Sequence, residues 1–237
     1  MGPHGSMSKT VAPTLHPCRD DHGREVSIRR PSTASPIVQW RDPGAIAVVV
    51  PEGLMIESLN GIPFEPCPAP SEAAGWGAAD GVGRPGDASD DAVFGAVSTE
   101  PPFMAPAGLA AAAGVVIREA DGRVWSVAPT NGFGGYSLTF PKGRLEAGLD
   151  PRAAARKEAH EEVGLCIEIT GFLIDLPRST TFTRYYLARR IGGTPAAMGW
   201  ESQAVWLVPR ARLREVITHP NDRPLLDALD ARCPETP

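Results

Sequence analysis

The sequence lacks the features that mark several large classes of protein. No apolar run approaches the roughly 18 residues that a membrane-spanning helix needs. No apolar stretch of the kind found in secretory signals follows the opening residues MGPHGSM, which resemble a tag remnant (residues 1–6) ahead of Met7. The net charge is −5 and the pI is about 5.6, so the broad basic surface typical of nucleic-acid-binding proteins is missing. We therefore expect a cytoplasmic protein with no membrane contact and no nucleic-acid partner.

Cysteine is also scarce, and its placement shows no paired spacing. The four cysteines are Cys18, Cys67, Cys166 and Cys233. Scattered cysteines without a secretory signal are typical of reduced, cytosolic proteins, and we expect all four to be free thiols. The stretch HPCRDDH brings His16, Cys18 and His22 close together, but structural zinc sites usually show a second close pair elsewhere in the chain. A zinc site is therefore not the expected interpretation.

The composition changes near residue 106. Residues 1–106 contain fifteen of the 25 prolines. Between Pro68 and Pro106 the chain is mostly Ala, Gly, Asp, Ser and Pro without sustained periodicity, which is typical of a linker. Upstream, Ala45–Val50 is a candidate strand, and Leu59–Phe64 carries apolar residues that suit a neighbouring surface. We expect residues 1–106 to be an extension that is partly ordered at most. It either wraps its own domain or serves as a dimer arm or lid.

From residue 107 to 232 the pattern is that of one α/β domain, followed by a short tail at 233–237. The expected strands are Ala111–Glu119, Val124–Pro129, Ser137–Phe140, Cys166–Leu176 with a break at Gly171, Ser179–Arg190 and Ala204–Val208. The expected helices are Pro151–Val163, Arg210–Val216 and Arg223–Ala231. Strands on both sides of one long helix predict a mixed sheet with flanking helices.

The long helix has clear signals at both ends. Asp150 is a good N-cap, Pro151 suits the first helical position, and Gly164 can end the helix in a left-handed conformation. At 100° per residue, Glu158, Glu161 and Glu162 fan over about 100° of one side. The apolar residues of the adjoining arc are Ala155, Ala159 and Val163. The acids therefore lie at the edge of the buried face.

Acids placed in this way repel one another. Like charges three or four residues apart cost a few tenths of a kcal/mol on an isolated helix, and partial burial increases that cost. A hard divalent cation such as Mg²⁺ reverses it, because such cations take carboxylate oxygens as ligands. The alternative is a solvated acidic face, which is the commoner origin of clustered glutamates.

At these residues the sequence resembles the Nudix hydrolase family, whose signature is G-x5-E-x7-R-E-U-x-E-E-x-G-U, where U is a bulky aliphatic residue. The matching positions are Gly143, Glu158, Glu161, Glu162, Gly164 and Leu165. The signature's first Glu is replaced by Leu149 and its Arg by Lys157. Because the pairing of those two positions is lost, we expect Lys157 to reach Glu146 instead. The resemblance implies an α/β/α sandwich over residues 107–232.

The resemblance also implies an activity and a set of ligands. The activity is metal-dependent hydrolysis of a diphosphate linkage in a nucleoside diphosphate joined to another group, such as a dinucleoside polyphosphate, a nucleoside triphosphate or ADP-ribose. Mg²⁺ or Mn²⁺ would be held by Glu158 and Glu162, with Glu161 as a ligand through water or as the base. Glu201, outside the signature, is a candidate base or extra ligand. The alternative is a catalytically weak module that binds a nucleotide or a protein, which the departures at Leu149 and Lys157 favour.

Several residues near the signature are candidates for substrate binding. Lys142, Gly143 and Arg144 lie in the loop before the helix. Arg178 and Arg184 bracket STTFT and, by strand alternation, are expected to share one face. Solvated arginines are the alternative. Tyr136 is a candidate for stacking on a base, although such an aromatic residue is more often part of the core than a ligand contact. The expected partner is a small phosphorylated molecule, and a homodimer stays open.

Overall fold

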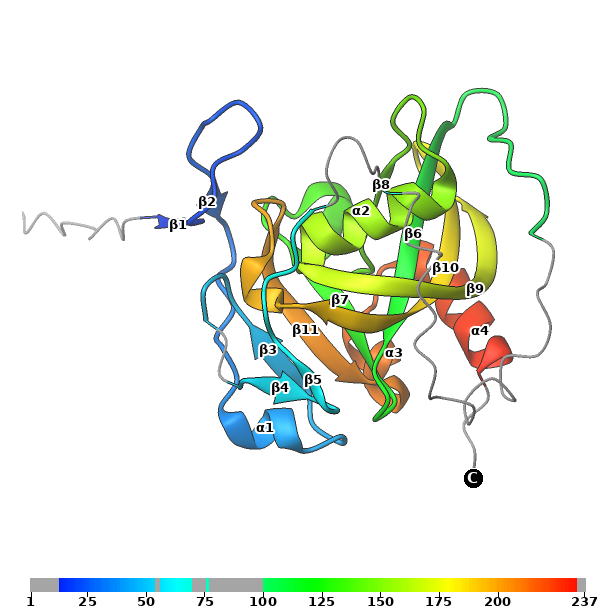
Figure 1. The fold of residues 1–237 in the computed structure, drawn as a ribbon. Helices are drawn as coiled ribbons and strands as arrows, with labels where there is room; N and C mark the ends of the chain where they lie inside the picture. The colour runs from blue at the N-terminus through cyan, green and yellow to red at the C-terminus, as the bar shows by residue number, and fades with distance from the viewer. Residues whose placement is uncertain (1–12, 54–55, 70–75, 77–99, 234–237) are drawn as a thin grey trace, which may run out of the picture.

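The structure is a computed structural model that describes residues 13–53, 56–69, 76 and 100–233 (Figure 1). Most of the linker predicted between residues 68 and 106 lies outside this range. At the centre is a seven-stranded mixed sheet with the strand order β3-β11-β7-β6-β10-β9, and β8 pairs with β6 off this path. The strands are β3 (Ala47–Val49), β6 (Ala110–Arg118), β7 (Arg123–Pro129), β8 (Lys142–Arg144), β9 (Leu165–Pro177), β10 (Thr181–Gly193) and β11 (Ser202–Pro209). Only β6 and β10 pair in parallel; the other pairs are antiparallel.

Helices cover both faces of this sheet, as the sequence predicts. The helices are α1 (Ile37–Arg41), α2 (Pro151–Val163), α3 (Leu213–Val216) and α4 (Arg223–Arg232). Alternate residues of the strands feed two separate apolar clusters: Val115 and Ile117 lie in the cluster with α2, and Val116 lies in the cluster with α3 and α4. The α/β/α sandwich is therefore confirmed. None of the described helices is long and apolar enough to cross a bilayer.

The predicted helix 151–163 is found with the same bounds. The Asp150 carboxylate accepts hydrogen bonds from the backbone N–H groups of Arg152 and Ala153, and Gly164 ends the helix with φ of 72°. A side chain on Gly164 would also collide with the backbone of Thr194. Start and end of the helix are thus fixed by local chemistry.

Two strand predictions need correction. Ser137–Phe140 is not a strand: Thr139 makes an isolated bridge with Val127, and Pro141 lacks the N–H group that would extend the pairing. The short strand lies next along the chain, as β8. The predicted break at Gly171 is also wrong, since β9 runs through it and the irregularity is taken up as shifts of register against β10.

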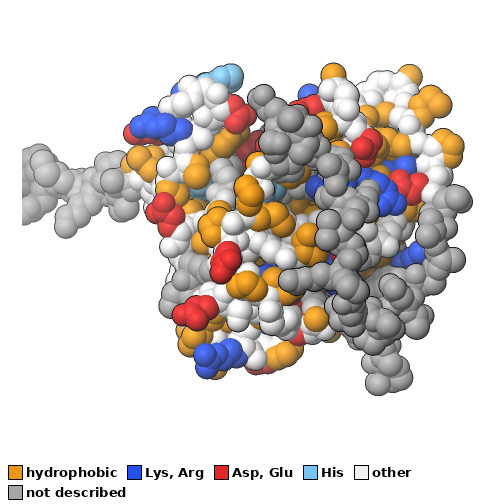
Figure 2. Space-filling model, in the orientation of Figure 1, with side chains coloured by type: hydrophobic (Ala, Val, Ile, Leu, Met, Phe, Trp, Pro, Cys, Tyr) orange, Lys and Arg blue, Asp and Glu red, His pale blue; other side chains and the backbone are white. Residues whose placement is uncertain are grey.

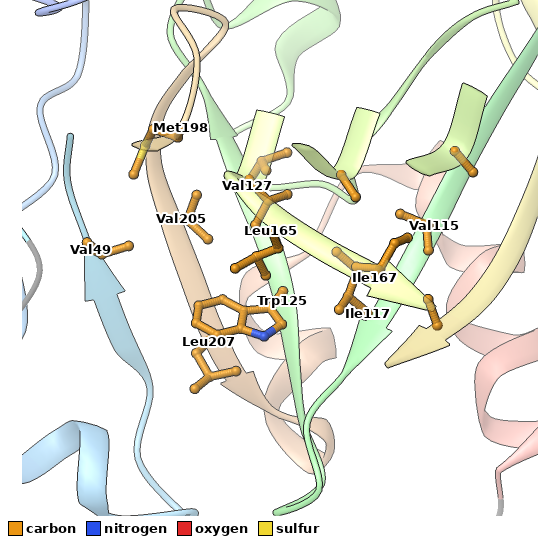
Figure 3. Close-up of a cluster of buried hydrophobic side chains, with 14 of the residues drawn as sticks. Val49, Val115, Ile117, Trp125, Val127, Leu165, Ile167, Met198, Val205 and Leu207 are labelled. Atoms are coloured by element: carbon orange, nitrogen blue, oxygen red, sulfur yellow. The ribbon is translucent and has the colours of Figure 1, made fainter. Parts of the chain in front are cut away.

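Part of the N-terminal segment belongs to this sheet and its core. β3 pairs with β11, and the hairpin of β4 (Ser58–Leu59) and β5 (Ile62–Pro63) follows. Trp40 and Phe64 pack against Trp125 with ring centroids 6.2 and 6.3 Å from it. Figure 3 shows Trp125 inside this cluster, beside Leu207 and Leu165. The segment thus wraps its own domain in the described region.

The prediction of four free thiols is wrong for one pair. Cys67 and Cys166 form a disulfide that spans 99 residues of sequence, while Cys18 and Cys233 are free. Their distance in sequence hid a pairing that only the fold brings together. Next to the bridge, a ring nitrogen of His160 lies 3.1 Å from the carbonyl oxygen of Cys67, and the imidazole contacts the ring of Trp76 at a tilt of 60° with 5.4 Å between the ring centroids. The N-terminal segment therefore also follows the outer side of α2.

Candidate active site

The three glutamates of α2 lie where the helical arc predicts. Glu158 is only 8% exposed, Glu162 is half-buried, and the side chain of Glu161 is 49% exposed. The residues of the adjoining arc, all fully buried, are Ala155, Ala159 and Val163. Two of the three acids are thus withdrawn from water, which makes their negative charge expensive.

The cost of this placement appears in the pKa values. Burial, followed by repulsion from Glu162 and Glu161, raises the pKa of Glu158 to about 9. Burial raises the pKa of Glu162 to about 7, against the opposing effect of Lys142. Glu201 also acts on both, and its own pKa is raised by burial and then by Asp21 and Glu161. The fold therefore brings Glu201, which lies outside the signature, into the electrostatic group.

The loop and strand before the helix hold these acids directly. The Glu162 carboxylate accepts a hydrogen bond of 2.9 Å from the backbone N–H of Lys142. Gly143 pairs with Ala113 of β6, and a Cβ atom at Gly143 would collide with the carboxylate of Glu158. Glycine is required here because the backbone and a carboxylate approach closely. Arg144 is exposed at the end of β8.

The residues fit a divalent cation by donor chemistry. Buried carboxylates with raised pKa values, packed against a glycine, supply the oxygen ligands that Mg²⁺ and Mn²⁺ prefer. Within the described part of the chain, however, no three His, Cys, Asp or Glu side chains are arranged to hold a metal ion. One physical reason is visible at Glu161, which is drawn to Lys157 at 2.6 Å.

The predicted contact of Lys157 with Glu146 is confirmed, with 3.0 Å between Nζ and Oε1. The contact with Glu161 was not predicted. Lys157 occupies the position where the Nudix signature has Arg, and it joins the loop to the helix. Its carboxylate partner in the loop is Glu146, because the signature's Glu is replaced by Leu149.

The expectation that Arg178 and Arg184 share a face is wrong. Arg178 lies in the turn before β10, so strand alternation does not extend to it, and it sits over the Tyr185 ring with Asp222 at 2.7 Å. Arg184 lies within β10 and points opposite to its neighbour Tyr185, pairing with Asp175 at 2.7 Å. The arginines therefore lie on opposite faces of the sheet.

Tyr136 lies beside the loop, in contact with residues that the sequence analysis did not single out. Its hydroxyl meets Arg178 and Asn221, and its ring stacks on His219 at 3.9 Å. Lys142 Nζ lies 5.2 Å from the ring centre. The signal that could have found His219 and Asn221 is the polar HPND stretch immediately before α4, because polar residues are favoured where a helix begins.

A separate cavity of about 800 Å³ lies at the other end of β6 and β7. It is bordered by α1, by the β4–β5 hairpin and by the turn after β6. None of the predicted site residues lines it, so the acids of α2 are not part of it. The face drawn in Figure 2 carries acidic and basic side chains that are scattered among apolar ones.

Comparison with known proteins supports one family. Residues 108–229 match the NUDIX domain. An RNA pyrophosphohydrolase of Caulobacter vibrioides is 33% identical over 100 residues, which are 41% of this chain and 55% of that protein. The chain thus spans about half the length of this curated relative.

Solved structures with a similar fold include a MutT chain from work on Aliivibrio salmonicida and Vibrio cholerae, with 20% identity over 52% of this chain and 98% of that one, at a TM-score of 0.46. An Ap4A hydrolase of C. elegans has 21% identity over 51% of this chain and 96% of that one, at a TM-score of 0.41. Likenesses at these scores carry no weight for the reaction. The domain match covers more than half of the chain, and the chain belongs to the Nudix family.

Proposed function

We propose that the chain hydrolyses a diphosphate linkage in a nucleoside diphosphate joined to another group, with Mg²⁺ or Mn²⁺ bound at Glu158 and Glu162. The observation that supports this most is the pair of neighbouring carboxylates with raised pKa values: Glu158, buried against Gly143, and Glu162, held by the backbone N–H of Lys142. Such a pair is unfavourable by itself and becomes favourable once a cation binds.

The protein's own groups have separate roles in this proposal. A bound divalent cation neutralises phosphate charge and acidifies a water molecule. Glu158 and Glu162 would hold this cation, and Glu161 would be a further ligand if its contact with Lys157 were released. Glu201, whose pKa is raised by burial, or Glu161 accepts the proton of the attacking water. Lys142 faces the phosphates, and Arg178, which is buried and paired with Asp222, contributes through its contact with Tyr136. Arg144 at the end of β8 and Arg184 on the other face are weaker candidates.

The test is a phosphate-release assay over a panel of substrates with Mg²⁺, with Mn²⁺ and with EDTA. The panel holds a dinucleoside tetraphosphate, a nucleoside triphosphate, ADP-ribose and, prompted by the name of the Caulobacter relative, an RNA with a 5′-triphosphate. Release that depends on the metal supports the proposal, and the best substrate defines the class. No release from any member with either metal would contradict it.

A second candidate function is a Nudix module that binds nucleotides or a protein without turnover. The contact of Lys157 with Glu161 favours it, because that contact holds a proposed ligand away from the others. Binding of a nucleotide without hydrolysis, measured by calorimetry, would distinguish this function from the first. A homodimer and a cytoplasmic location stay predictions, which sedimentation and fractionation would test.

A further inference from the structure

The hydroxyl group of Tyr136 is restricted to one role by its neighbours. Arg178 Nη1 lies 3.2 Å and Asn221 Nδ2 lies 3.0 Å from the phenolic oxygen. Guanidinium and amide N–H groups can only donate, so the oxygen accepts both hydrogen bonds. Its own proton must then be donated elsewhere, and no acceptor for it is found among the described residues. Tyr136 is half-buried, so a ligand can reach it.

The ring of Tyr136 is already in contact with two side chains of the protein. The imidazole of His219 stacks on it with a centroid distance of 3.9 Å and an interplanar angle of 28°. The ammonium of Lys142 also lies over the ring, 5.2 Å from its centre. The stacking role predicted for Tyr136 is therefore already taken by the protein's own side chains.

The surroundings of the hydroxyl favour an anionic oxygen as its acceptor. Arg178 is neutralised by the buried carboxylate of Asp222 at 2.7 Å, whereas Lys142 makes no ion pair within the described region. The charge of Lys142 is thus left for a ligand. The backbone N–H of the same residue donates to Glu162, so Lys142 links the ring of Tyr136 to the acids of α2.

We propose that the Tyr136 hydroxyl donates a hydrogen bond to a phosphoryl oxygen of the substrate and holds that phosphate beside Lys142. The inference rests on the proposed function, since it assigns one residue's task at the same site. Tyr136 acts through its proton, and its ring serves to fix Lys142 and His219 in place.

The test is the variant Tyr136→Phe, which keeps the ring with its packing and removes only the hydroxyl. Binding of inorganic pyrophosphate and of ADP with Mg²⁺ is measured by calorimetry, without any need for turnover. Both affinities are expected to fall about tenfold or more, since a hydrogen bond to a charged oxygen is worth at least that. With the substrate found in the panel, KM is expected to rise by a similar factor and to change more than kcat.

Tyr186→Phe is the matched control, because it also removes one phenolic hydroxyl and keeps the ring. The Tyr186 hydroxyl donates to Glu100, on the face of the sheet that carries α2. The control variant is expected to leave both affinities unchanged, and thermal melting confirms that both variants fold. Unchanged pyrophosphate binding in Tyr136→Phe would overturn the inference, as would a loss confined to ADP or a wild-type chain that does not bind pyrophosphate. If the chain binds pyrophosphate through Tyr136 but hydrolyses nothing, the proposed function fails while this inference stands.

Discussion

Carboxylates buried at the sheet and on helix α2 have opposite surroundings. At the sheet, Glu119 is enclosed by donors: Arg190 Nε at 2.5 Å, Trp125 Nε1 at 2.8 Å and Asn60 Nδ2 at 2.9 Å. On α2, Glu158 and Glu162 face further acids, and their pKa values rise. The first group has its cation within the chain, whereas the second lacks one.

The difference separates a structural role from a chemical one. Arg190 also donates to the carbonyl oxygen of Leu59 at 2.8 Å and lies over the ring of Phe64, so the balanced group fastens the N-terminal segment to the sheet. In the unbalanced group one backbone N–H, that of Lys142, donates to Glu162, and the pKa values stay raised in spite of the nearby lysines. Protons or an external cation would neutralise the remaining charge. Residues of the same type thus differ in function because of what their neighbours donate.

The largest expected effect comes from neutralising the unbalanced group. Glu158→Gln and Glu162→Gln should each lower metal-dependent phosphate release by about 1,000-fold, because bound metal contributes several kcal/mol to the transition state. Steady-state assays over the substrate panel measure this. Glu168→Gln, an exposed acid on β9, is the control and should keep full activity. Equal activity in all three variants would remove the distinction between the two groups.

Breaking the balanced group should instead affect folding. Arg190→Met leaves Glu119 buried without its cation and is expected to lower the free energy of unfolding by about 3–5 kcal/mol. Urea denaturation gives the value. Arg189→Met removes an exposed ion pair with Glu168 and should cost about 1 kcal/mol at most. Similar losses in the two variants would mean that the pair of Arg190 and Glu119 has no special weight.

The disulfide, like Arg190, connects the N-terminal segment to the rest of the domain, but by a covalent bond. Cys67→Ser opens the bridge to Cys166 and should lower the free energy of unfolding by about 2–4 kcal/mol. The same loss should follow from adding a reductant to the wild-type chain, and the reductant should have no further effect on the variant. Cys18→Ser, which removes an exposed free thiol, is the control. Insensitivity of the wild-type chain to reductant would argue that the bridge is not formed.

The pH dependence of stability should reveal the unbalanced group without any assay of activity. The folded pKa values of Glu158 and Glu162 lie above the ordinary value of 4.5, so the folded state binds protons more tightly than the unfolded state. Their contribution is therefore fully present below about pH 4.5 and is lost as the pH rises toward about 9. Denaturation in EDTA should show this fall, and Mg²⁺ or the Gln variants should flatten it. A rise over the same range would contradict the raised pKa values.

The smallest effect is expected at Lys157, a lysine beside the unbalanced group that pairs with one of its acids, Glu161. Lys157→Ala removes its contacts with Glu146 and Glu161 and should cost about 1 kcal/mol, since both partners are largely in water. Chemical denaturation measures it. If the contact with Glu161 keeps that ligand from the metal, the variant should also need less Mg²⁺ for half-maximal activity. An unchanged Mg²⁺ requirement would count against that role.

Local signals in the sequence were sufficient for much of the fold. The cap at Asp150, the proline after it and Gly164 define α2 with the same bounds as the structure, because each acts within a few residues. The arc of the acids follows from helix geometry alone. Pairings across the sheet were harder to predict. Pro141 ends the pairing of residues 137–140, so the short strand forms at β8 instead. Nothing in the sequence near Gly171 shows that β9 continues through it with shifts of register against β10.

The site was predictable where it depends on one helix and its loop, and less so elsewhere. Arg178 and Arg184 were placed together because alternation was extended past the first residue of β10. The pairing of Asp222 with Arg178, 44 residues away, has no local signal, although the HPND stretch that contains Asp222 marks the start of α4. The bridge between Cys67 and Cys166 was missed for the same reason, since the partners meet only once the N-terminal segment has wrapped the domain.

The short strand β3 has a practical consequence. The family match begins at residue 108, and a truncated protein that starts there would seem complete. Such a truncation would remove the partner strand of β11 at Val205 and Leu207 and would expose the indole of Trp125. β11 would then be an exposed edge strand, whose unpaired backbone N–H and C=O groups can pair with another molecule. Preparations of the isolated homology region should therefore precipitate or self-associate, and the preceding hundred residues are best kept in any expression plan.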